Sequence, residues 1–350
     1  MKTVRVHASV TYDILIAKGS LSRCGQYATS VFQPGSKAAI ISDDTVASLY
    51  LDKVKASFEE AGYTTSVYIF PHGEDSKSAE VLFKVYDFLI QEQVTRSDFI
   101  VALGGGVVGD LAGYAAATYL RGIRFMQIPT TFLAAVDSSV GGKTAINIPA
   151  GKNLIGAFHQ PSLVLCDTET FNTLPPETFA DGVAETIKYG LISSSSLFEE
   201  MEAGNIDEKI DEIVAQCVSI KRDIVEQDEH DTGLRMILNY GHTLGHAIEK
   251  VTNHSVTHGH GVAMGMVLIA QLGEKLGLHG SELTQRIIHC IARYGLPTHY
   301  DGSLSELTEA VLHDKKRSGA NIRLIIVKEV GSAEILPLSV QQFTQLLSEV

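Results

Sequence analysis

Four polar residues between positions 235 and 246 have a spacing that could build a ligand site. On an α-helix, Arg235, Asn239, His242 and His246 would lie at roughly 0°, 40°, 340° and 20° around the axis, because each residue turns the helix by about 100°. Two histidines four residues apart on one helix face are a known metal-binding geometry. A solvated helix face would produce the same stripe, so the pattern alone leaves both explanations open.

A carboxylate and a third histidine could complete a metal site. Glu185 and Lys188 lie three residues apart and would share a helix face, where an exposed ion pair is the alternative explanation. His258 belongs to a second histidine motif flanked by glycines. Glu185, His242 and His258 together would form an open zinc site, since three protein ligands leave a position for substrate oxygens.

A glycine-rich turn follows an apolar run at 98–103. The segment from Gly104 to Asp110 would open a helix, and its backbone N–H groups could approach a pyrophosphate at the positive helix end. Its spacing differs from the G-x-G-x-x-G pattern, so a tight strand-to-helix turn is the alternative. Asp43 ends an earlier apolar run, where it could accept from a ribose hydroxyl or cap the next helix.

The chain is acidic, which makes its clustered cations informative. Its net charge of −13 argues against a nucleic acid or an anionic membrane as partner. Several cations stand beside glycine, asparagine or motif-like residues, and together they suit a substrate with a phosphate and a carboxylate. They are Arg121, Lys143, Lys152, Lys188, Lys221, Arg235, Lys315 and Lys316.

The elements that must position these residues change in type along the chain. Up to about residue 174, apolar strand-like runs alternate with helical segments, which predicts a parallel sheet in an α/β domain. Strands are expected in the segment 4–17 and at 37–42, 64–70, 98–103, 124–128 and 163–166. We therefore expect residues 1–174 to form a Rossmann-like α/β domain.

The remainder, residues 175–350, is expected to be a mostly α-helical domain that binds metal and substrate. Helices are expected at 175–192, 206–227, 234–251, 258–278, 281–294, 304–312 and 340–348, with one β-like run at 322–327. Among the 350 residues, no apolar stretch approaches the roughly 18 residues of a membrane span, and the N-terminus lacks a signal-peptide pattern. The four cysteines show no Cys-x-x-Cys spacing. We expect a cytoplasmic protein with buried, reduced thiols.

Nine short motifs occur in order along nearly the whole chain, outside residues 1–35 and 195–215. They are HGEDSK at 72–77, LGGGVVGD at 103–110, QIPTT at 127–131, VDSSVGGKTAIN at 136–147, GKNLIG at 151–156, AETIKYG at 184–190, LRMILNYGHTLGHAIE at 234–249, HGHGVAMGM at 258–266 and DKK at 314–316. In number and order they resemble the 3-dehydroquinate synthases, which are sugar phosphate cyclases.

The resemblance implies an N-terminal NAD-binding domain and a helical C-terminal domain with zinc, or cobalt in its place. It carries the metal role to Glu185, His242 and His258. It carries NAD contacts to Asp43, Glu74, Lys77, Gly105, Gly106, Val107, Asp110, Thr130, Thr131, Lys152, Thr173 and Leu174. It carries substrate contacts to Asp137, Lys143, Asn153, Lys188, Lys221, Arg235, Asn239, His246 and a lysine of the 314–316 motif, assigned here to Lys316.

The activity implied by the resemblance is that of a carbon–oxygen lyase of the shikimate pathway, which leads to aromatic amino acids. The substrate would be 3-deoxy-D-arabino-heptulosonate 7-phosphate, and the steps would be transient oxidation by NAD, phosphate elimination, re-reduction and aldol closure to 3-dehydroquinate. Lys143, Asn153, Asn239 and His246 would hold the phosphate, and Lys221 with Arg235 the carboxylate. The resemblance also implies a homodimer in which Arg121 reaches the partner's active site.

One position departs from the family pattern, and other activities compete. His260 stands where the family usually has an acidic residue, which would change the surroundings of His258. The alternatives are another sugar phosphate cyclase, a metal-dependent polyol or glycerol-phosphate dehydrogenase, and a nucleotide-sensing module without catalysis. Lys221 and Arg235 favour a substrate that carries a carboxylate, and the metal triad argues against a sensor.

Overall fold

The structure is a computed structural model that describes residues 1–315 and 321–349. Its chain forms two compact units. One consists of Met1–Pro175 together with Ile210–His230, and the other of Pro176–Lys209 together with Asp231–Val350. The chain thus leaves the first unit at Pro175 and returns to it over residues 210–230, a return that the sequence did not predict.

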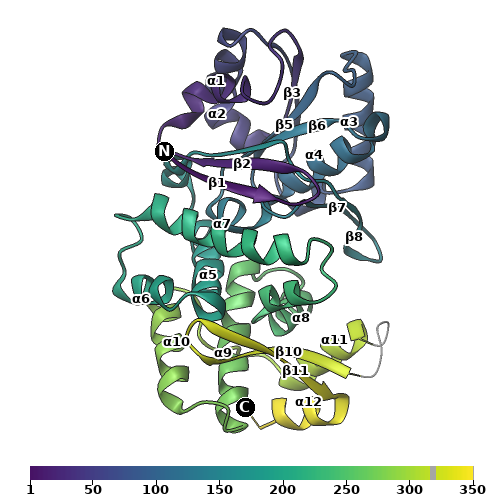
Figure 1. Ribbon diagram of the computed structural model, residues 1–350. Helices are drawn as coiled ribbons and strands as arrows, with labels where there is room; N and C mark the ends of the chain where they lie inside the picture. Colours follow the sequence, from purple (N-terminus) through teal and green to yellow (C-terminus); the bar gives the residue numbers. More distant parts are fainter. Residues whose placement is uncertain (316–320, 350) are drawn as a thin grey trace. The chain divides into compact units, whose positions relative to one another are not determined.

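A seven-stranded sheet forms the centre of the first unit, with strand order β1-β2-β9-β6-β5-β3-β4 (Figure 1). Its strands are β1 (Lys2–His7), β2 (Thr11–Ile16), β3 (Lys37–Asp43), β4 (Thr64–Phe70), β5 (Phe99–Gly104), β6 (Arg124–Pro129) and β9 (Leu163–Cys166). All neighbours pair in parallel except β1 with β2. The predicted parallel sheet is confirmed, and its central strands are almost wholly apolar because helices cover both faces.

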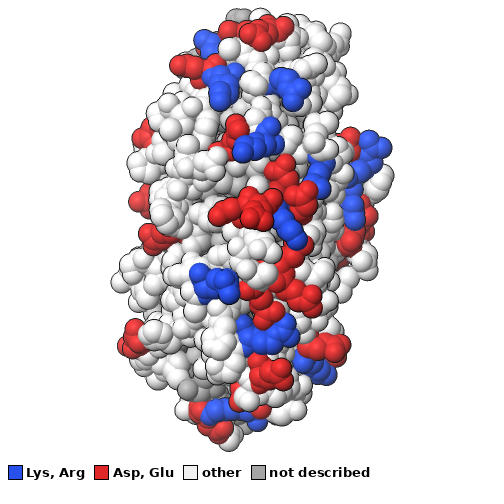
Figure 2. Space-filling model, turned by 90° about the vertical axis from the view of Figure 1, so that its left-hand side faces the viewer, with Lys and Arg blue, Asp and Glu red and all other residues white. Residues whose placement is uncertain are grey.

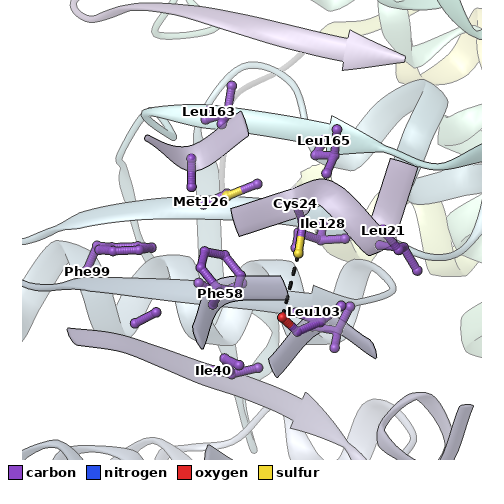
Figure 3. Close-up of a cluster of buried hydrophobic side chains, with 14 of the residues drawn as sticks. Leu21, Cys24, Ile40, Phe58, Phe99, Leu103, Met126, Ile128, Leu163 and Leu165 are labelled. Atoms are coloured by element: carbon purple, nitrogen blue, oxygen red, sulfur yellow. Dashed lines mark hydrogen bonds between the residues drawn. The ribbon is translucent and has the colours of Figure 1, made fainter. Parts of the chain in front are cut away.

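Alternate residues of β5 contribute to two separate cores. Phe99 and Leu103 pack with Phe58 and Cys24 in the core drawn in Figure 3, whereas Ile100 and Ala102 belong to the core on the other face. The helices of this unit are α1 (Cys24–Ala28), α2 (Asp44–Glu60), α3 (Ala79–Gln91), α4 (Gly106–Thr118) and α7 (Ile210–Gln227). An antiparallel hairpin of β7 (Lys143–Ile148) and β8 (Gly151–Phe158), which the sequence did not predict, completes the unit.

The second unit is mostly helical, as predicted. Its helices are α5 (Pro176–Ser193), α6 (Ser195–Ala203), α8 (His242–Val251), α9 (His258–Lys275), α10 (Ser281–Arg293), α11 (Leu304–Lys315) and α12 (Val340–Leu347). The β-like run at 322–327 is confirmed as part of β10 (Asn321–Glu329), which pairs with β11 (Ser332–Ser339). Strand β11 was not predicted.

The single helix predicted over 234–251 is wrong. Leu234–Asn239 forms a 3-10 turn, Tyr240 is extended, and α8 begins only at His242. Gly241, between them, has φ of 78°, in the left-handed region that favours glycine. A Cβ there would lie 2.7 Å from Met266 Cγ and 2.8 Å from the carbonyl oxygen of Val262, so close approach to α9 also requires glycine.

Within the described part of the chain, no helix is long and apolar enough to cross a membrane. On the face drawn in Figure 2, Asp and Glu side chains are interspersed with Lys and Arg, and the blue side chains do not merge into a continuous basic patch. The four cysteines, Cys24, Cys166, Cys217 and Cys290, are all free and buried, which confirms the prediction of buried reduced thiols.

Candidate metal and cofactor sites

A buried carboxylate faces two imidazoles in the second unit. Glu185 lies on α5, while His242 and His258 are the first residues of α8 and α9. Glu185 Oε1 is 3.3 Å from His242 Nε2 and 3.5 Å from His258 Nε2. Ligand atoms of a tetrahedral zinc site lie roughly 3.3–3.6 Å apart, because each is about 2.0–2.2 Å from the ion. The three predicted ligands therefore have the spacing of a metal site.

The environment of Glu185 also suits a cation. Its side chain is 0% exposed, and neither oxygen accepts a well-directed hydrogen bond from the described residues, although Lys188 Nζ lies 2.5 Å from Oε2. Lys188 is only 1% exposed, so the pair is not the exposed ion pair considered as an alternative. Burial alone would raise the pKa of Glu185, but the charges of Lys188 and His242 outweigh it and hold that pKa well below normal.

A third imidazole, that of His246, lies one turn along α8 from His242. The nearest ring nitrogens of His242, His246 and His258 are within 4.8 Å of one another. His246 is an exposed residue, but desolvation of its imidazole and the neighbouring imidazoles lower its pKa. The structure therefore brings His246 to the candidate metal site, where it could contact either the ion or a ligand on it.

Arg235 and Asn239 do not continue this histidine face as predicted. Both lie in the 3-10 turn that precedes Gly241, so the four-residue stripe of a single helix does not exist. Arg235 is buried and Asn239 is exposed. The error arises from Tyr240 and Gly241, whose backbone angles interrupt the helical repeat on which the predicted stripe depended.

Two carboxylates near the histidines were missed by the sequence analysis. Glu249 Oε1 is 2.9 Å from His258 Nδ1, and Asp181 Oδ1 is 3.1 Å from His260 Nδ1. His260 thus pairs with Asp181 and is not a member of the histidine cluster. The spacing of Glu249, seven residues after His242 on the same helix face, was the signal that could have identified it.

In the first unit, the predicted glycine turn opens α4. Gly105 caps α4 without a side-chain hydrogen bond, which leaves the N–H groups of the first turn, including that of Val107, available to a ligand. A Cβ on Gly105 would lie 2.9 Å from Thr131 Cγ2, and one on Gly106 would lie 3.3 Å from Ser138 Oγ. The neighbouring Thr130 donates its N–H to the carbonyl of Gly104 at 3.1 Å.

The polar residues predicted around this turn form one connected group. Lys77 Nζ is 2.6 Å from Asp110 Oδ2 and 3.7 Å from Glu74 Oε1. Asn147, on β7, donates its side-chain N–H to Glu74 at 2.7 Å, a contact that the sequence analysis missed. Burial raises the pKa of Asp110, and the charge of Lys77 opposes that effect. The unpredicted hairpin therefore supports the predicted cofactor residues.

Three further predicted cofactor residues lie elsewhere in the unit. Asp43 caps α2 by accepting the N–H of Val46 at 2.8 Å, so the capping alternative holds for this side chain. Thr173 ends the 3-10 turn Thr168–Thr173, its hydroxyl contacts Tyr50, and Leu174 follows it.

The substrate residues predicted in the first unit lie on separate elements. Lys221 Nζ, from α7, is 2.5 Å from Asp137 Oδ1 and 2.7 Å from the Asp137 carbonyl. Lys143 begins β7, and Asn153 lies on β8 next to Lys152, which was predicted to contact NAD. The backbone N–H of Asn153 donates to Asn147 Oδ1 at 2.9 Å.

Arg121 is exposed and follows α4 in a short 3-10 turn, whereas Lys316 lies outside the described residues.

A cavity of about 660 Å³ in the first unit contains none of the predicted site residues. It is lined by residues that include Arg5, Asp13, Arg96, Arg124 and His159.

Two family models match successive parts of the chain. The family model described as 3-dehydroquinate synthase N-terminal matches residues 67–181, and the one described as 3-dehydroquinate synthase C-terminal matches residues 182–317. The chain belongs to the 3-dehydroquinate synthase family. The 3-dehydroquinate synthase of Streptococcus sanguinis strain SK36 is 46% identical over 97% of both chains.

Solved structures of other cyclases are similar over the full length. A 2-deoxy-scyllo-inosose synthase complexed with carbaglucose-6-phosphate, NAD+ and Co2+ has a TM-score of 0.90 at 25% identity and covers 99% of this chain and 100% of its own. A 2-epi-5-epi-valiolone synthase from Streptomyces hygroscopicus, with NAD+ and Zn2+ bound, has a TM-score of 0.88 at 23% identity over 99% of both chains. The second likeness shows the fold alone.

Proposed function

We propose that the protein is a 3-dehydroquinate synthase that converts 3-deoxy-D-arabino-heptulosonate 7-phosphate to 3-dehydroquinate and phosphate. The observation that carries this proposal is the 46% identity to a 3-dehydroquinate synthase over 97% of both chains. The 2-deoxy-scyllo-inosose synthase of similar fold is only 25% identical. The lower identity favours the dehydroquinate product over that of a sister cyclase.

Glu185, His242 and His258 would hold a zinc or cobalt ion. The fit is supported by the buried Glu185 oxygens, which lack well-directed donors among the described residues, and by the distances to the two Nε2 atoms. When bound, the ion would supply a Lewis acid for the hydroxyl and carbonyl oxygens of the substrate. Lys188 would keep Glu185 ionised, since its ammonium lies 2.5 Å from the carboxylate.

The glycine turn before α4 would hold NAD. Backbone N–H groups of Gly106 and Val107 at the positive end of the helix suit a pyrophosphate, and Lys77 with Asp110 supplies polar partners beside them. NAD would accept a hydride and return it within one turnover, so the reaction would need no second oxidant.

The anionic groups of the substrate would require cations and amides. We assign the phosphate to Lys143, Asn153, Asn239 and His246, and the carboxylate to Lys221 and Arg235. Asp137 supports the role of Lys221 because it contacts the ammonium through both its carboxylate and its carbonyl. Such a contact restricts where a flexible lysine side chain can point.

Assembly and location are part of the same proposal. The protein would act as a homodimer in which Arg121 contributes to the active site of the partner subunit. It would work in the cytoplasm, where its four buried free thiols would stay reduced.

The test mixes the protein with the heptulosonate phosphate, NAD+ and zinc, and follows phosphate release together with absorbance at 340 nm. A synthase should release phosphate without accumulating NADH, because the hydride returns to the product. Stoichiometric NADH would instead identify a polyol or glycerol-phosphate dehydrogenase, and absence of turnover would identify a sensor. Faster turnover of sedoheptulose 7-phosphate, which lacks the carboxylate, would identify a sister cyclase.

A further inference from the structure

Glu249 lies on the opposite side of the His258 ring from Glu185. It belongs to α8, is only 7% exposed, and its Oε1 is 2.9 Å from His258 Nδ1. The other nitrogen of the same ring, Nε2, is 3.5 Å from Glu185 Oε1. The imidazole is therefore held between two carboxylates, one at each ring nitrogen.

This contact determines which nitrogen of His258 faces the metal site. An ionised carboxylate can only accept, so the Nδ1 atom beside Glu249 must carry a proton, and Nε2 is left to donate its lone pair to a metal ion. His242 is arranged in the same sense, since its Nδ1 lies 3.1 Å from the carbonyl of Tyr240. Both ligand rings thus present Nε2 to Glu185.

The two rings differ in the strength of their partners. A carboxylate accepts a stronger hydrogen bond than a carbonyl and makes the imidazole a more basic ligand. The nearby His254 does not account for Glu249 equally well, because its Nδ1 is 3.9 Å from Oε2 and its side chain is 51% exposed. Burying a carboxylate is costly unless it is paired, and the shortest of these pairs is with His258.

We propose that Glu249 is a positioning residue for the metal site, which orients His258 so that its Nε2 binds a divalent ion together with Glu185 and His242. The inference rests on the ligand set of the proposed function. It gives a role to Glu249, the last residue of the motif at 234–249, which the predicted ligand set did not include. The face of α8 from His242 to Glu249 then supplies one ligand, His242, and the residue that orients a second ligand, His258.

The test measures metal binding rather than turnover. Wild type, Glu249→Gln and Glu249→Ala are stripped of metal and titrated with Zn2+ and Co2+ in competition with a chromophoric chelator. We expect both variants to bind the ions roughly 10–100-fold more weakly, as for other residues that support a metal-binding histidine. The visible spectrum of the Co2+ form should also change, because a reoriented His258 alters the ligand field.

A matched control separates this role from a general loss of an ion pair. Glu202, in the same unit, pairs with Arg286 at 2.7 Å and 2.9 Å and is not one of the residues of the histidine cluster. Glu202→Gln should therefore keep the affinity and Co2+ spectrum of wild type. Saturating zinc should restore phosphate release to Glu249→Gln, since the ligands themselves remain.

Unchanged affinity and an unchanged Co2+ spectrum in folded Glu249→Gln would overturn the inference, and this isosteric variant decides the matter if Glu249→Ala does not fold. The proposed function fails separately. If wild type binds the ions with the expected dependence on Glu249 but releases no phosphate from the heptulosonate phosphate, the synthase assignment is wrong and the role of Glu249 stands.

Discussion

The histidines at the candidate metal site offer a direct test of which ring binds the ion. His242 Nε2 is 3.3 Å from Glu185, whereas no ion pair joins His246 to that carboxylate among the described residues. His242→Ala should therefore lose metal affinity by about 100-fold or more, as expected when one of three ligands is removed. His246→Ala should keep the metal within a few-fold and still release phosphate poorly. Metal analysis after dialysis, with circular dichroism to verify folding, distinguishes the two variants.

The predicted binding site for the substrate carboxylate depends on Arg235, which is buried in the second unit. A guanidinium pairs with a carboxylate through two parallel hydrogen bonds, which lysine cannot reproduce. Both Arg235→Lys and Arg235→Ala should lower kcat/KM for the heptulosonate phosphate by roughly 2–5 kcal/mol in transition-state stabilisation, the cost of leaving a buried charge unpaired. Zinc and NAD binding should persist.

The control for the Arg235 variants is a second sugar phosphate that lacks the carboxylate. Wild type should turn over sedoheptulose 7-phosphate poorly, and the Arg235 variants should show no additional loss on it. An equal loss on both sugars would mean that Arg235 supports the fold or the phosphate and not the carboxylate.

The sequence grouped three candidate metal ligands that the structure brings close together, but it did not single out the carboxylate beside them. Glu185, His242 and His258 stand in motifs whose residue types suggest chemistry on their own. Glu249 looks like an ordinary acidic residue near the end of a helix, and its role depends on which helix packs beside it. Its spacing from His242 places Glu249 on the same face of α8, but its contact with His258, the first residue of α9, depends on how the two helices pack.

Elements with continuous apolar composition were predicted most accurately. β4 and β9 occupy the predicted residues, and β3, β5 and β6 differ by at most one residue at either end. β5 and β9 are buried throughout, and strands buried on both faces need apolar side chains along their whole length. The hairpin of β7 and β8 lacks that signal, since most residues of β8 are exposed. The prediction of one helix over 234–251 was wrong, although the residue pattern is compatible with a helix. The chain breaks at Gly241, which lies close against α9, and α8 begins only at His242.

The requirement for glycine at position 241, the N-cap of α8, can be tested by substitution. Gly241→Ala places a Cβ 2.7 Å from Met266 Cγ and requires φ of 78° from a residue that disfavours it. Left-handed geometry and overpacking together should cost roughly 2–5 kcal/mol and weaken metal binding, because His242 follows directly. Urea unfolding and zinc titration measure both effects.

Gly280 provides the matched control. It caps α10 with negative φ, and a Cβ there would meet nothing within 4 Å. Gly280→Ala should change stability by about 1 kcal/mol or less, the usual range for a glycine-to-alanine change at a helix cap. Equal destabilisation by the two variants would contradict a specific requirement for glycine at 241.

At the scale of the whole molecule, the sequence pattern indicated a change of fold near residue 175. It did not indicate that α7 belongs to the first unit. The segment 210–227 is amphipathic and helical, as predicted, and such a helix can cover either a sheet or other helices. Its contacts are with β1, β2 and the turn Ala134–Ser138, which places it in the first unit. Lys221 and Asp137 meet only because of this return.

The proposed homodimer can be tested through Arg121, which would act in the active site of the partner subunit. Leu120 and Arg121 both have positive φ, of 50° and 66°, and the Arg96 side chain donates twice to the Leu120 carbonyl that precedes Arg121. Strain of about 1–3 kcal/mol per residue persists where the surrounding structure enforces it, and such strain is typical of functional positions. An exposed arginine held in this way suits a contact outside its own chain.

If each site of a symmetric dimer combines Lys143 of one chain with Arg121 of the other, Arg121→Ala and Lys143→Ala dimers should both be inactive. Unfolding and refolding an equal mixture should give heterodimers in which one of the two sites has both residues, and roughly a quarter of wild-type activity should return, because half of the dimers are mixed. Differently tagged chains allow the heterodimer to be isolated and assayed alone. Pure heterodimer without activity would place Arg121 in the site of its own chain, and a monomer in analytical ultracentrifugation would exclude a shared site altogether.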